Sequence, residues 1–436
     1  NDKKNNTPKS EVANVAVIAE SKPEFKRTQI NYNEEIFPDE PIPQDASFTF
    51  LSKPDKIKTI LSQVFKFRYH EITGKIQFCK KDEEIYIDFT DRHFNTLRTY
   101  LLTHYFNAAL PEADLRMVIE SDFSPSYCPI RDYFETIPAW DGNDYIKELA
   151  ELAKIKQGQF GEDKDGKIID VNKIWYLYLR RWLIATVATM TGRYENHTCL
   201  TLLGDQGIGK TTFLRNLGIQ DDLVYVGALN PADKDSKILY AEKVLIVLDE
   251  LEATTRHELA SIKSQMTLSS ISVRRAYGRR SEVLPRRASF CASANDVHVL
   301  GDLTGSRRWL CLEVQKTDYK AVTPELMRNV YSQAFQLLNN GEKYWFDNEE
   351  IQKLEKRNSR FYSPCAEEEA LLKYYSKINF DNTNARYLTN SELLQELSFK
   401  FPSIGFSSKK LGQVLAKQNF ERGKKGGVYC YAVNPV

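Results

Sequence analysis

The chain has 436 residues, of which 42% are hydrophobic, 27% charged and 12% aromatic, and its formal net charge is +1. This is an ordinary globular composition, and the 23 Tyr, 23 Phe and 5 Trp exclude a chain that is disordered throughout. No stretch approaches the roughly 18 apolar residues of a membrane-spanning helix, so we expect no membrane association. The seven Cys lack a C-x-x-C pair and the first nine residues are polar. These features predict a cytoplasmic protein with reduced thiols.

Three segments precede the most informative part of the chain. Residues 1–45 are poor in large apolar side chains, and we interpret them as a flexible linker that buries too little surface to offset its chain entropy. Residues 46–114 show two helical patterns around a hairpin and predict a small α/β module, either a spacer or a DNA-touching accessory. Residues 115–197 are expected to be mostly helical, with an apolar helix over 175–185 that packs beneath the next domain. The chain starts at Asn1 rather than Met, so its numbering is compatible with an upstream domain such as a primase.

Residues 198–362 alternate short apolar strands with turns and then become helical, which predicts a P-loop ATPase core with a helical extension. Residues 204–211 have the pattern G-x-x-x-x-G-K-[ST] between a predicted strand and a predicted helix. Glycines let such a loop wrap a phosphate with its N–H groups turned inward. We therefore expect ATP here, with Lys210 at the β- and γ-phosphates and Thr211 on Mg²⁺. The expected nucleotide-binding residues are Gly204, Gly207, Gly209, Lys210, Thr211 and Thr212.

Polar side chains further along predict the rest of a hydrolytic site. An apolar strand ends in Asp249, expected to hold Mg²⁺, and Glu250, expected to orient and polarise the attacking water. A later strand ends in Asn295, which fits a sensor of that water. Arg307 and Arg308 suit an arginine finger that reaches a neighbouring subunit's γ-phosphate, and the sequence does not choose between them. The structural alternatives are capping carboxylates, a turn Asn and a surface ion pair.

A basic stretch interrupts this core. Six Arg lie within residues 274–287, with Glu282 as the acid among them, and the pattern predicts a hairpin with Arg and Tyr at its tip. Arg and Lys bind phosphates regardless of sequence, and Tyr can stack on a base, so we expect DNA contact. A solvated face, or a role toward ATP or another subunit, is the alternative. The expected contacts are Lys263, Arg274, Arg275, Tyr277, Arg279 and Arg280.

Residues 363–436 predict a winged-helix domain, because three helical patterns are followed by two strands with a Gly-rich tip. From residue 386 onward this segment carries eight basic and three acidic side chains. Its basic face predicts contact with DNA or a partner, and the alternative is a basic cap that only packs on its neighbour. The expected contacts are Lys409, Lys410, Lys424 and Lys425.

Taken in order, these motifs resemble the virulence-associated protein E family, which is similar to the superfamily 3 and phage primase-helicase AAA+ ATPases. The resemblance covers about residues 115–345 and rests on residues 127–133, 140–142, 204–211, 249–252, 263, 274–279 and 302–309. It implies the roles given above for the loop, the two carboxylates, Asn295 and the arginine pair. One departure is that the family usually ends the sensor strand in Gly-Thr-x-Asn, where this chain has Ala-Ser-Ala-Asn at 292–295.

The sequence thus favours an ATP-dependent helicase or translocase acting on single-stranded or forked DNA in replication of a phage or other mobile element. The resemblance implies a homo-oligomeric ring, such as a hexamer, with ATP hydrolysed between subunits. A second hypothesis is an ATP-switched initiator or loader that binds DNA through the winged helix and unwinds little. A third, a P-loop kinase or other transferase, would need neither the Arg cluster nor the winged helix. The sequence leaves open the polarity of translocation, the ring size, the sequence preference, and whether the nucleic acid is DNA or RNA.

Overall fold

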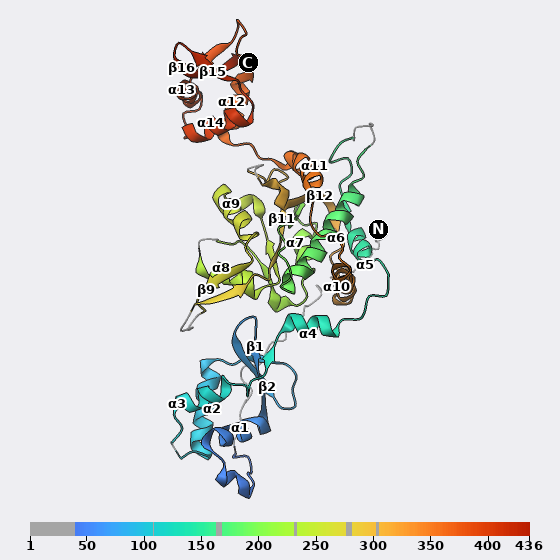
Figure 1. Ribbon diagram of the computed structural model, residues 1–436, viewed down its shortest axis with the longest axis vertical. Coiled ribbons are helices and arrows are strands. Elements are labelled where there is room, and N and C mark those ends of the chain that lie inside the picture. Colours follow the sequence, from blue (N-terminus) through green and yellow to red (C-terminus); the bar gives the residue numbers. More distant parts are fainter. Residues whose placement is uncertain (1–39, 108, 163–167, 231–232, 276–280, 302–304) are drawn as a thin grey trace, which may run out of the picture. The chain divides into compact units, whose positions relative to one another are not determined.

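The computed structural model describes residues 40–107, 109–162, 168–230, 233–275, 281–301 and 305–436. The chain forms two compact units, one reaching Tyr69 and including Lys75–Ser126, the other comprising His70–Gly74 and Tyr127–Val436 (Figure 1). Each unit contains both helices and β-sheet, which confirms the predicted α/β class. Among the helices of these described ranges, none is both long enough and apolar enough to cross a bilayer.

The first unit is a small sheet with helices packed around it. Its elements are η1 (Ala46–Phe50), α1 (Lys53–Val64), β1 (Phe65–His70), β2 (Lys75–Lys80), β3 (Ile87–Asp88), α2 (Asp91–His104), α3 (Glu112–Ile119) and β4 (Ser126–Tyr127), with strand order β3-β2-β1-β4. Ser52 caps α1 by accepting the Asp55 N–H, so this helix begins where its apolar spacing begins. Phe67, Phe78 and Leu101 lie in the buried core between helices and sheet. The predicted hairpin and its two flanking helices are confirmed.

A six-stranded sheet is the centre of the second unit. Its order is β5 (Ala153–Ile155), β12 (Trp309–Thr317), β6 (Cys199–Leu203), β11 (Ser289–Ala294), β8 (Leu245–Leu248) and β7 (Val224–Val226). β12, β6, β11, β8 and β7 run parallel, and β5 pairs antiparallel with β12. The continuous apolar runs that predicted these strands match a sheet buried on both faces.

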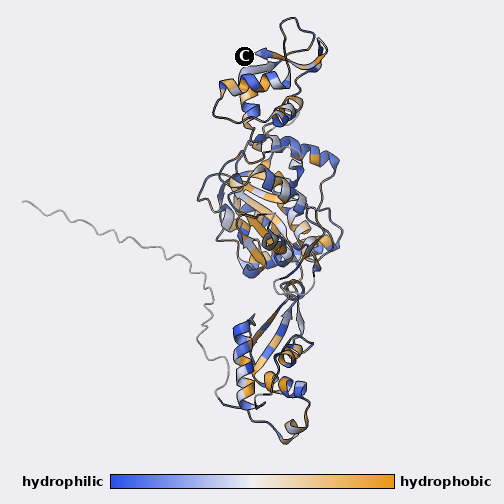
Figure 2. Ribbon diagram, turned by 90° about the vertical axis from the view of Figure 1, so that its left-hand side faces the viewer, coloured by the Kyte–Doolittle hydropathy of each residue, from blue (hydrophilic) through white to orange (hydrophobic). Residues whose placement is uncertain are grey.

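Helices cover both faces of this sheet. One face packs on α4 (Pro129–Thr136), α5 (Tyr145–Glu151), α6 (Val171–Met190), α7 (Lys210–Arg215) and α10 (Pro324–Asn339), and the other on α8 (Lys234–Glu242) and α9 (Arg256–Gln265) (Figure 1). The predicted apolar helix is α6, and its Trp182 is fully buried and donates its indole N–H to the carbonyl oxygen of Phe290 at 2.9 Å. Figure 2 shows hydrophobic residues concentrated on the central strands and on the helix surfaces that face them.

The edge strand β5 departs from the mostly helical segment predicted for residues 115–197. Its Ala153 pairs with Thr317 and its Ile155 with Val314, and both are buried while Lys154 is exposed. A strand of three residues is too short to show a period of two, and it directly follows α5. Its pairing partner lies far along the chain, so the strand forms through a non-local contact that the local pattern does not contain.

Two strands confirm the predicted basic hairpin. β9 (Ser270–Val273) and β10 (Glu282–Pro285) pair antiparallel, with Val273 opposite Glu282. The residues predicted for its tip, Tyr277, Gly278, Arg279 and Arg280, lie outside the described residues.

The C-terminal segment follows α11 (Asn348–Asn358) and has its own small core. Its elements are α12 (Ala366–Tyr374), β13 (Tyr375–Lys377), β14 (Arg386–Leu388), α13 (Asn390–Lys400), α14 (Ser408–Lys417), β15 (Arg422–Lys425) and β16 (Val428–Pro435). The three predicted helices and the hairpin β15–β16 are present, and β13 and β14 also pair with β16. Leu393, Leu411 and Val433 are fully buried between helices and strands.

Candidate functional site

The carboxyl ends of three neighbouring parallel strands converge at one edge of the central sheet. β6 leads into the glycine loop of residues 204–209, β8 leads into Asp249, and β11 leads into Asn295. Since β11 lies between β6 and β8, the side chains that follow the three strands meet in space. Ligands of open parallel sheets bind at this edge.

The glycines of the loop are required by its backbone. Gly204, Gly207 and Gly209 have φ of 140°, 83° and 83°, values that residues with a side chain rarely adopt. A Cβ at Gly204 would lie 2.4 Å from the carbonyl oxygen of Val314, and one at Gly209 would lie 2.3 Å from Cδ1 of Tyr319. No described atom lies within 4 Å of the position that a Cβ would take at Gly207, so the loop is open there. This geometry fits a loop that a phosphate approaches closely.

Lys210 opens α7 with its side chain folded back over the loop. Its Nζ donates to the carbonyl oxygens of Gly204 and Asp205, both at 2.7 Å, and to Oδ1 of Asn295 at 3.2 Å. Burial lowers the pKa of Lys210, while the carboxylates of Glu252, Asp205 and Asp249 act in the opposite direction. The structure therefore fixes one positive charge at the mouth of the loop. Thr212 follows in the first turn of α7 and is half-buried.

Three side-chain oxygens gather beside Lys210. Oδ1 of Asp249 accepts the hydroxyl of Thr211 at 2.8 Å and the hydroxyl of Ser293 at 2.7 Å, and the two hydroxyl oxygens are 3.0 Å apart. Carboxylate and hydroxyl oxygens suit Mg²⁺, which usually takes one or two protein ligands and completes its shell with water and phosphate. The described ranges hold no cluster of three or more His, Cys, Asp or Glu side chains that could hold a metal ion.

Ser293 and Glu252 contact the predicted site residues, but their sequence patterns did not lead us to assign them to the site. Ser293 occupies the position where the resembled family has Thr, so the hydroxyl is retained although the residue differs. Glu252 Oε1 accepts both the backbone N–H and the side-chain amide of Asn295, each at 3.0 Å. The sequence signal that could have identified them is their position: Glu252 lies in the motif at 249–252, and Ser293 lies in the stretch at 292–295.

Glu250 lies at the same edge but in a different environment. It is exposed, its φ of 53° is left-handed, and its N–H donates to Oδ1 of Asp249 at 3.1 Å. A non-glycine residue in this conformation is uncommon and costs free energy, which marks the turn after β8 as constrained. The structure thus places Glu250 next to Asp249, whereas Asn295 donates its hydrogen bonds to Glu252.

Arg307 and Arg308 lie at the opposite end of the sheet. They form η4 (Ser306–Arg308), which leads into the start of β12, where Trp309 is paired with Cys199 at the start of β6. The glycine loop follows the other end of β6. Arg307 is exposed and Arg308 half-buried, and burial, followed by the charge of Arg307, lowers the pKa of Arg308. The structure therefore does not bring either arginine to Lys210 of the same chain.

The residues predicted to touch DNA near the basic hairpin are in varied surroundings. Lys263 lies on α9 and Arg274 is exposed just after β9. Arg275 is largely buried, and its guanidinium pairs with Glu242 at 3.0 Å and Glu282 at 3.3 Å. It also donates to the carbonyl oxygen of Ile72 at 2.8 Å. These contacts make Arg275 a residue that anchors the base of the hairpin.

The four lysines predicted in the C-terminal segment are exposed. Lys409 and Lys410 lie in the first turn of α14, and Lys424 and Lys425 end β15. Lys425 Nζ lies 3.3 Å from the centroid of the Tyr387 ring. The segment therefore offers cations and an aromatic ring together, a combination that can contact a nucleic-acid backbone and a base.

Comparisons with known proteins assign the family. A search of curated proteins finds no match to the chain. Among solved structures, the apo structure of the NrS-1 C terminal region (305-718) has 12% identity and a TM-score of 0.41, covering 88% of this chain and 99% of the other. An A form apo structure of the same region gives 12% identity and a TM-score of 0.41, covering 87% and 98%. The profile of the virulence-associated protein E-like domain matches residues 135–363, which is more than half of the chain. This confirms the family named from the motifs, over residues 135–363 where about 115–345 was expected, and the chain belongs to the virulence-associated protein E-like domain family.

Proposed function

We propose that this chain is an ATP-dependent DNA helicase or translocase in the replication of a phage or mobile element. Its core would be a P-loop AAA+-like ATPase related to superfamily 3, and residues 363–436 a winged helix. The observation that carries the proposal is the convergence of Lys210, Thr211, Asp249 and Asn295 at the carboxyl edge of the sheet. In a small-molecule transferase the basic hairpin and the basic C-terminal segment would have no role.

Each residue of the edge has a chemical task in this proposal. Lys210 would neutralise the β- and γ-phosphates of ATP, and the loop amides would surround them. Thr211 and Asp249 would hold Mg²⁺, which stabilises charge on the phosphates when bound. Asn295 would position the attacking water, with its amide oriented by Glu252. Glu250, exposed beside Asp249, would polarise that water.

Hydrolysis between subunits follows from the distance of the arginines from the loop. An arginine finger stabilises the charge of the transferring phosphoryl group, yet Arg307 and Arg308 lie at the far end of the same sheet. They would therefore act on ATP held by a neighbouring copy, in a homo-oligomeric ring such as a hexamer. Arg307 is the more exposed of the two and is the better candidate for the finger.

DNA would be held by the basic hairpin and by the exposed lysines of the C-terminal segment. In this segment α14 carries Lys409 and Lys410, and β15 carries Lys424 and Lys425. That arrangement also favours the second function, an ATP-switched initiator or loader that binds duplex DNA and unwinds little. A loader would hydrolyse ATP slowly and bind duplex DNA well, whereas a translocase would respond to single strands.

The test is ATP hydrolysis with and without single-stranded DNA, for the wild type and for Lys210→Ala. We expect strong stimulation by DNA and a loss of about 10²–10³-fold in the variant, because a preorganised charge at the reacting phosphates is removed. Lys353→Ala, which removes an exposed lysine of α11, is the matched control and should hydrolyse ATP normally. Turnover that is indifferent to DNA would contradict a translocase. Activity retained in Lys210→Ala would contradict the assigned site.

A further inference from the structure

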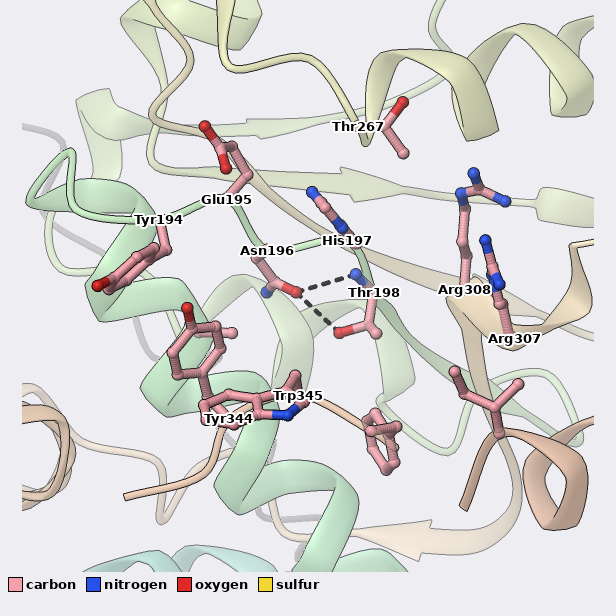
Figure 3. A pocket seen from close by; sticks show the side chains of 13 residues that line it. Tyr194, Glu195, Asn196, His197, Thr198, Thr267, Arg307, Arg308, Tyr344 and Trp345 are labelled. Atoms are coloured by element: carbon pink, nitrogen blue, oxygen red, sulfur yellow. Dashed lines mark hydrogen bonds between the residues drawn. The ribbon is translucent and has the colours of Figure 1, made fainter. Parts of the chain in front are cut away.

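A second concave site lies at the amino end of the central sheet, where the arginine pair is found. The pocket has a volume of about 430 Å³, within the range of small-ligand sites (Figure 3). Six separate parts of the chain line it: Ala185 of α6, residues 194–198 before β6, Thr267 after α9, the arginine pair in η4, residues 344–346 before α11, and Ile351 within α11.

The two sides of the pocket differ in chemistry. Tyr194, Tyr344 and Trp345 form an aromatic wall, with ring centroids 5.6 Å apart between the two tyrosines and 5.2 Å between Tyr344 and Trp345. Arg307 and Arg308 lie on the other side, and Glu195 points away from them beside Tyr194 (Figure 3). Tyr194 and Trp345 are 57% and 54% exposed, so these rings are not part of the core. Exposed aromatic side chains gathered in a concave site indicate a ligand.

Arg308 has an unmet hydrogen-bonding group. Its Nε is buried, and within the described part of the chain no acceptor lies in reach of it. The neighbouring positive charges of Arg307 and Arg308 oppose each other, so an anionic ligand at this arginine pair would be stabilising. His197 also lines the pocket, and burial, then the charge of Arg286, lowers its pKa and so favours the neutral ring, which has one donor and one acceptor nitrogen.

The floor of the pocket is rigid. Asn196 is buried, and its Oδ1 accepts the N–H and the hydroxyl of Thr198 at 2.9 and 2.8 Å. Its own N–H donates to Thr189 Oγ1 at 2.7 Å, which ties the floor to the end of α6. These hydrogen bonds fix the position of Asn196 between the end of α6 and the start of β6, so this part of the pocket is formed without a ligand.

We propose that this pocket binds a nucleotide, with its base stacked on Tyr344 and Trp345 and its phosphate at Arg308. Stacking on an aromatic ring accepts any base, and the fork of an arginine matches phosphate oxygens. The nucleotide is either a free mononucleotide or one residue of a single-stranded nucleic acid. The site is separate from the glycine loop and does not rest on the proposed ATPase function.

Binding is tested in the full chain carrying Lys210→Ala, so that the glycine loop contributes little. The probes are dAMP and a ten-nucleotide oligodeoxyadenylate, titrated by calorimetry. We expect binding that Trp345→Ala weakens about tenfold, that Trp345→Phe largely preserves, and that Arg308→Ala weakens further. Lys353→Ala, outside the pocket, should leave the affinity unchanged.

The outcomes distinguish a free nucleotide from a single-stranded nucleic acid, and the pocket proposal from the ATPase proposal. Binding of dAMP with this pattern of variants supports a free-nucleotide site, and binding of the oligonucleotide alone supports a single-strand site. No binding of either probe, or binding indifferent to Trp345→Ala, overturns the proposal. Trp345 is half exposed, so its variant stays informative even if Arg308→Ala unfolds. If the wild type hydrolyses no ATP and the pocket still binds, the ATPase proposal fails alone.

Discussion

The two ends of the central sheet are built in different ways. At the carboxyl end, short polar side chains that directly follow three strands bond to one another, and Lys210 is held by Asn295 and two loop carbonyls. At the amino end, aromatic and arginine side chains come from segments far apart in the sequence and leave a pocket between them. At the amino end the arginine pair lies away from the glycine loop of its own chain, at the opposite edge of the sheet. If both ends belong to one hydrolytic site, as we propose, that site needs two chains.

The largest effect is expected where the two ends must cooperate. Arg307→Ala is expected to slow ATP hydrolysis by about 10³-fold, because a finger supplies transition-state charge stabilisation of at least that size. Lys210→Ala is also expected to be inactive, because it removes the lysine at the carboxyl end of the sheet. In a random equimolar mixture, about a quarter of the subunit contacts combine an intact loop with an intact finger, so mixing should restore up to about a quarter of the activity.

The mixing experiment needs a check on assembly. Light scattering establishes that the two variants form mixed oligomers, and Lys210→Ala mixed with Lys353→Ala gives the dilution expected without complementation. If mixed oligomers form and Arg307→Ala is not rescued, the finger does not act between chains.

A smaller effect is expected within the carboxyl end. Ser293→Ala removes a hydroxyl that donates to Asp249 at 2.7 Å, so the carboxylate loses one of its two fixed side-chain partners. Groups that orient a metal ligand in this way typically change metal affinity 10–100-fold. We expect about a tenfold rise in the Mg²⁺ concentration for half-maximal ATP hydrolysis. Ser293→Thr keeps the hydroxyl and should stay near the wild type, and an unchanged Mg²⁺ dependence in Ser293→Ala would rule out this role.

These two ends also differ in how far the sequence predicts them. Lys210, Thr211, Asp249 and Asn295 each follow a recognisable strand, and parallel strands bring their carboxyl ends to one edge, so local patterns predicted their proximity. The roles proposed for them remain predictions. Glu252 and the edge strand β5 were missed because their partners, Asn295 and β12, are distant in the sequence.

The amino-end pocket was missed for the same physical reason. Tyr344 and Trp345 precede α11, Tyr194 follows α6, and no short motif connects them. The arginine pair was found by its place after the sensor strand, but its position at the opposite end of the sheet follows only from the pairing of Trp309 with Cys199. Local sequence therefore predicted which residues carry charge, and the sheet topology decides which of them can meet.

The smallest effect tests what supports Phe346, which lines the pocket next in sequence to Trp345 of the aromatic wall. Glu350 accepts from Arg181 at 2.6 Å and from Lys343 at 2.8 Å, and the Arg181 guanidinium lies 4.7 Å from the Phe346 ring centroid. These hydrogen bonds, the one from Arg181 foremost, hold the pKa of Glu350 well below its usual value. A carboxylate with a depressed pKa adds stability that is present above its unfolded pKa, about 4.3, and is lost as the pH falls toward the folded pKa.

Glu350→Gln should therefore lower the free energy of unfolding by about 1 kcal/mol at pH 7, a value reduced for solvent screening of a partly exposed pair. The difference from the wild type should shrink at pH 3–4, where Glu350 begins to be protonated in the unfolded chain. Urea unfolding at pH 7, 4 and 3 measures it, with Glu349→Gln as the control, because Glu349 is exposed and pairs with Lys353 one turn away. A difference that is absent at pH 7, or that persists in acid, would mean that this ionic contact does not stabilise the chain beside Phe346. The affinity of the glycine loop for ATP should be the same in both variants, since the two ends of the sheet share no side chain in these networks.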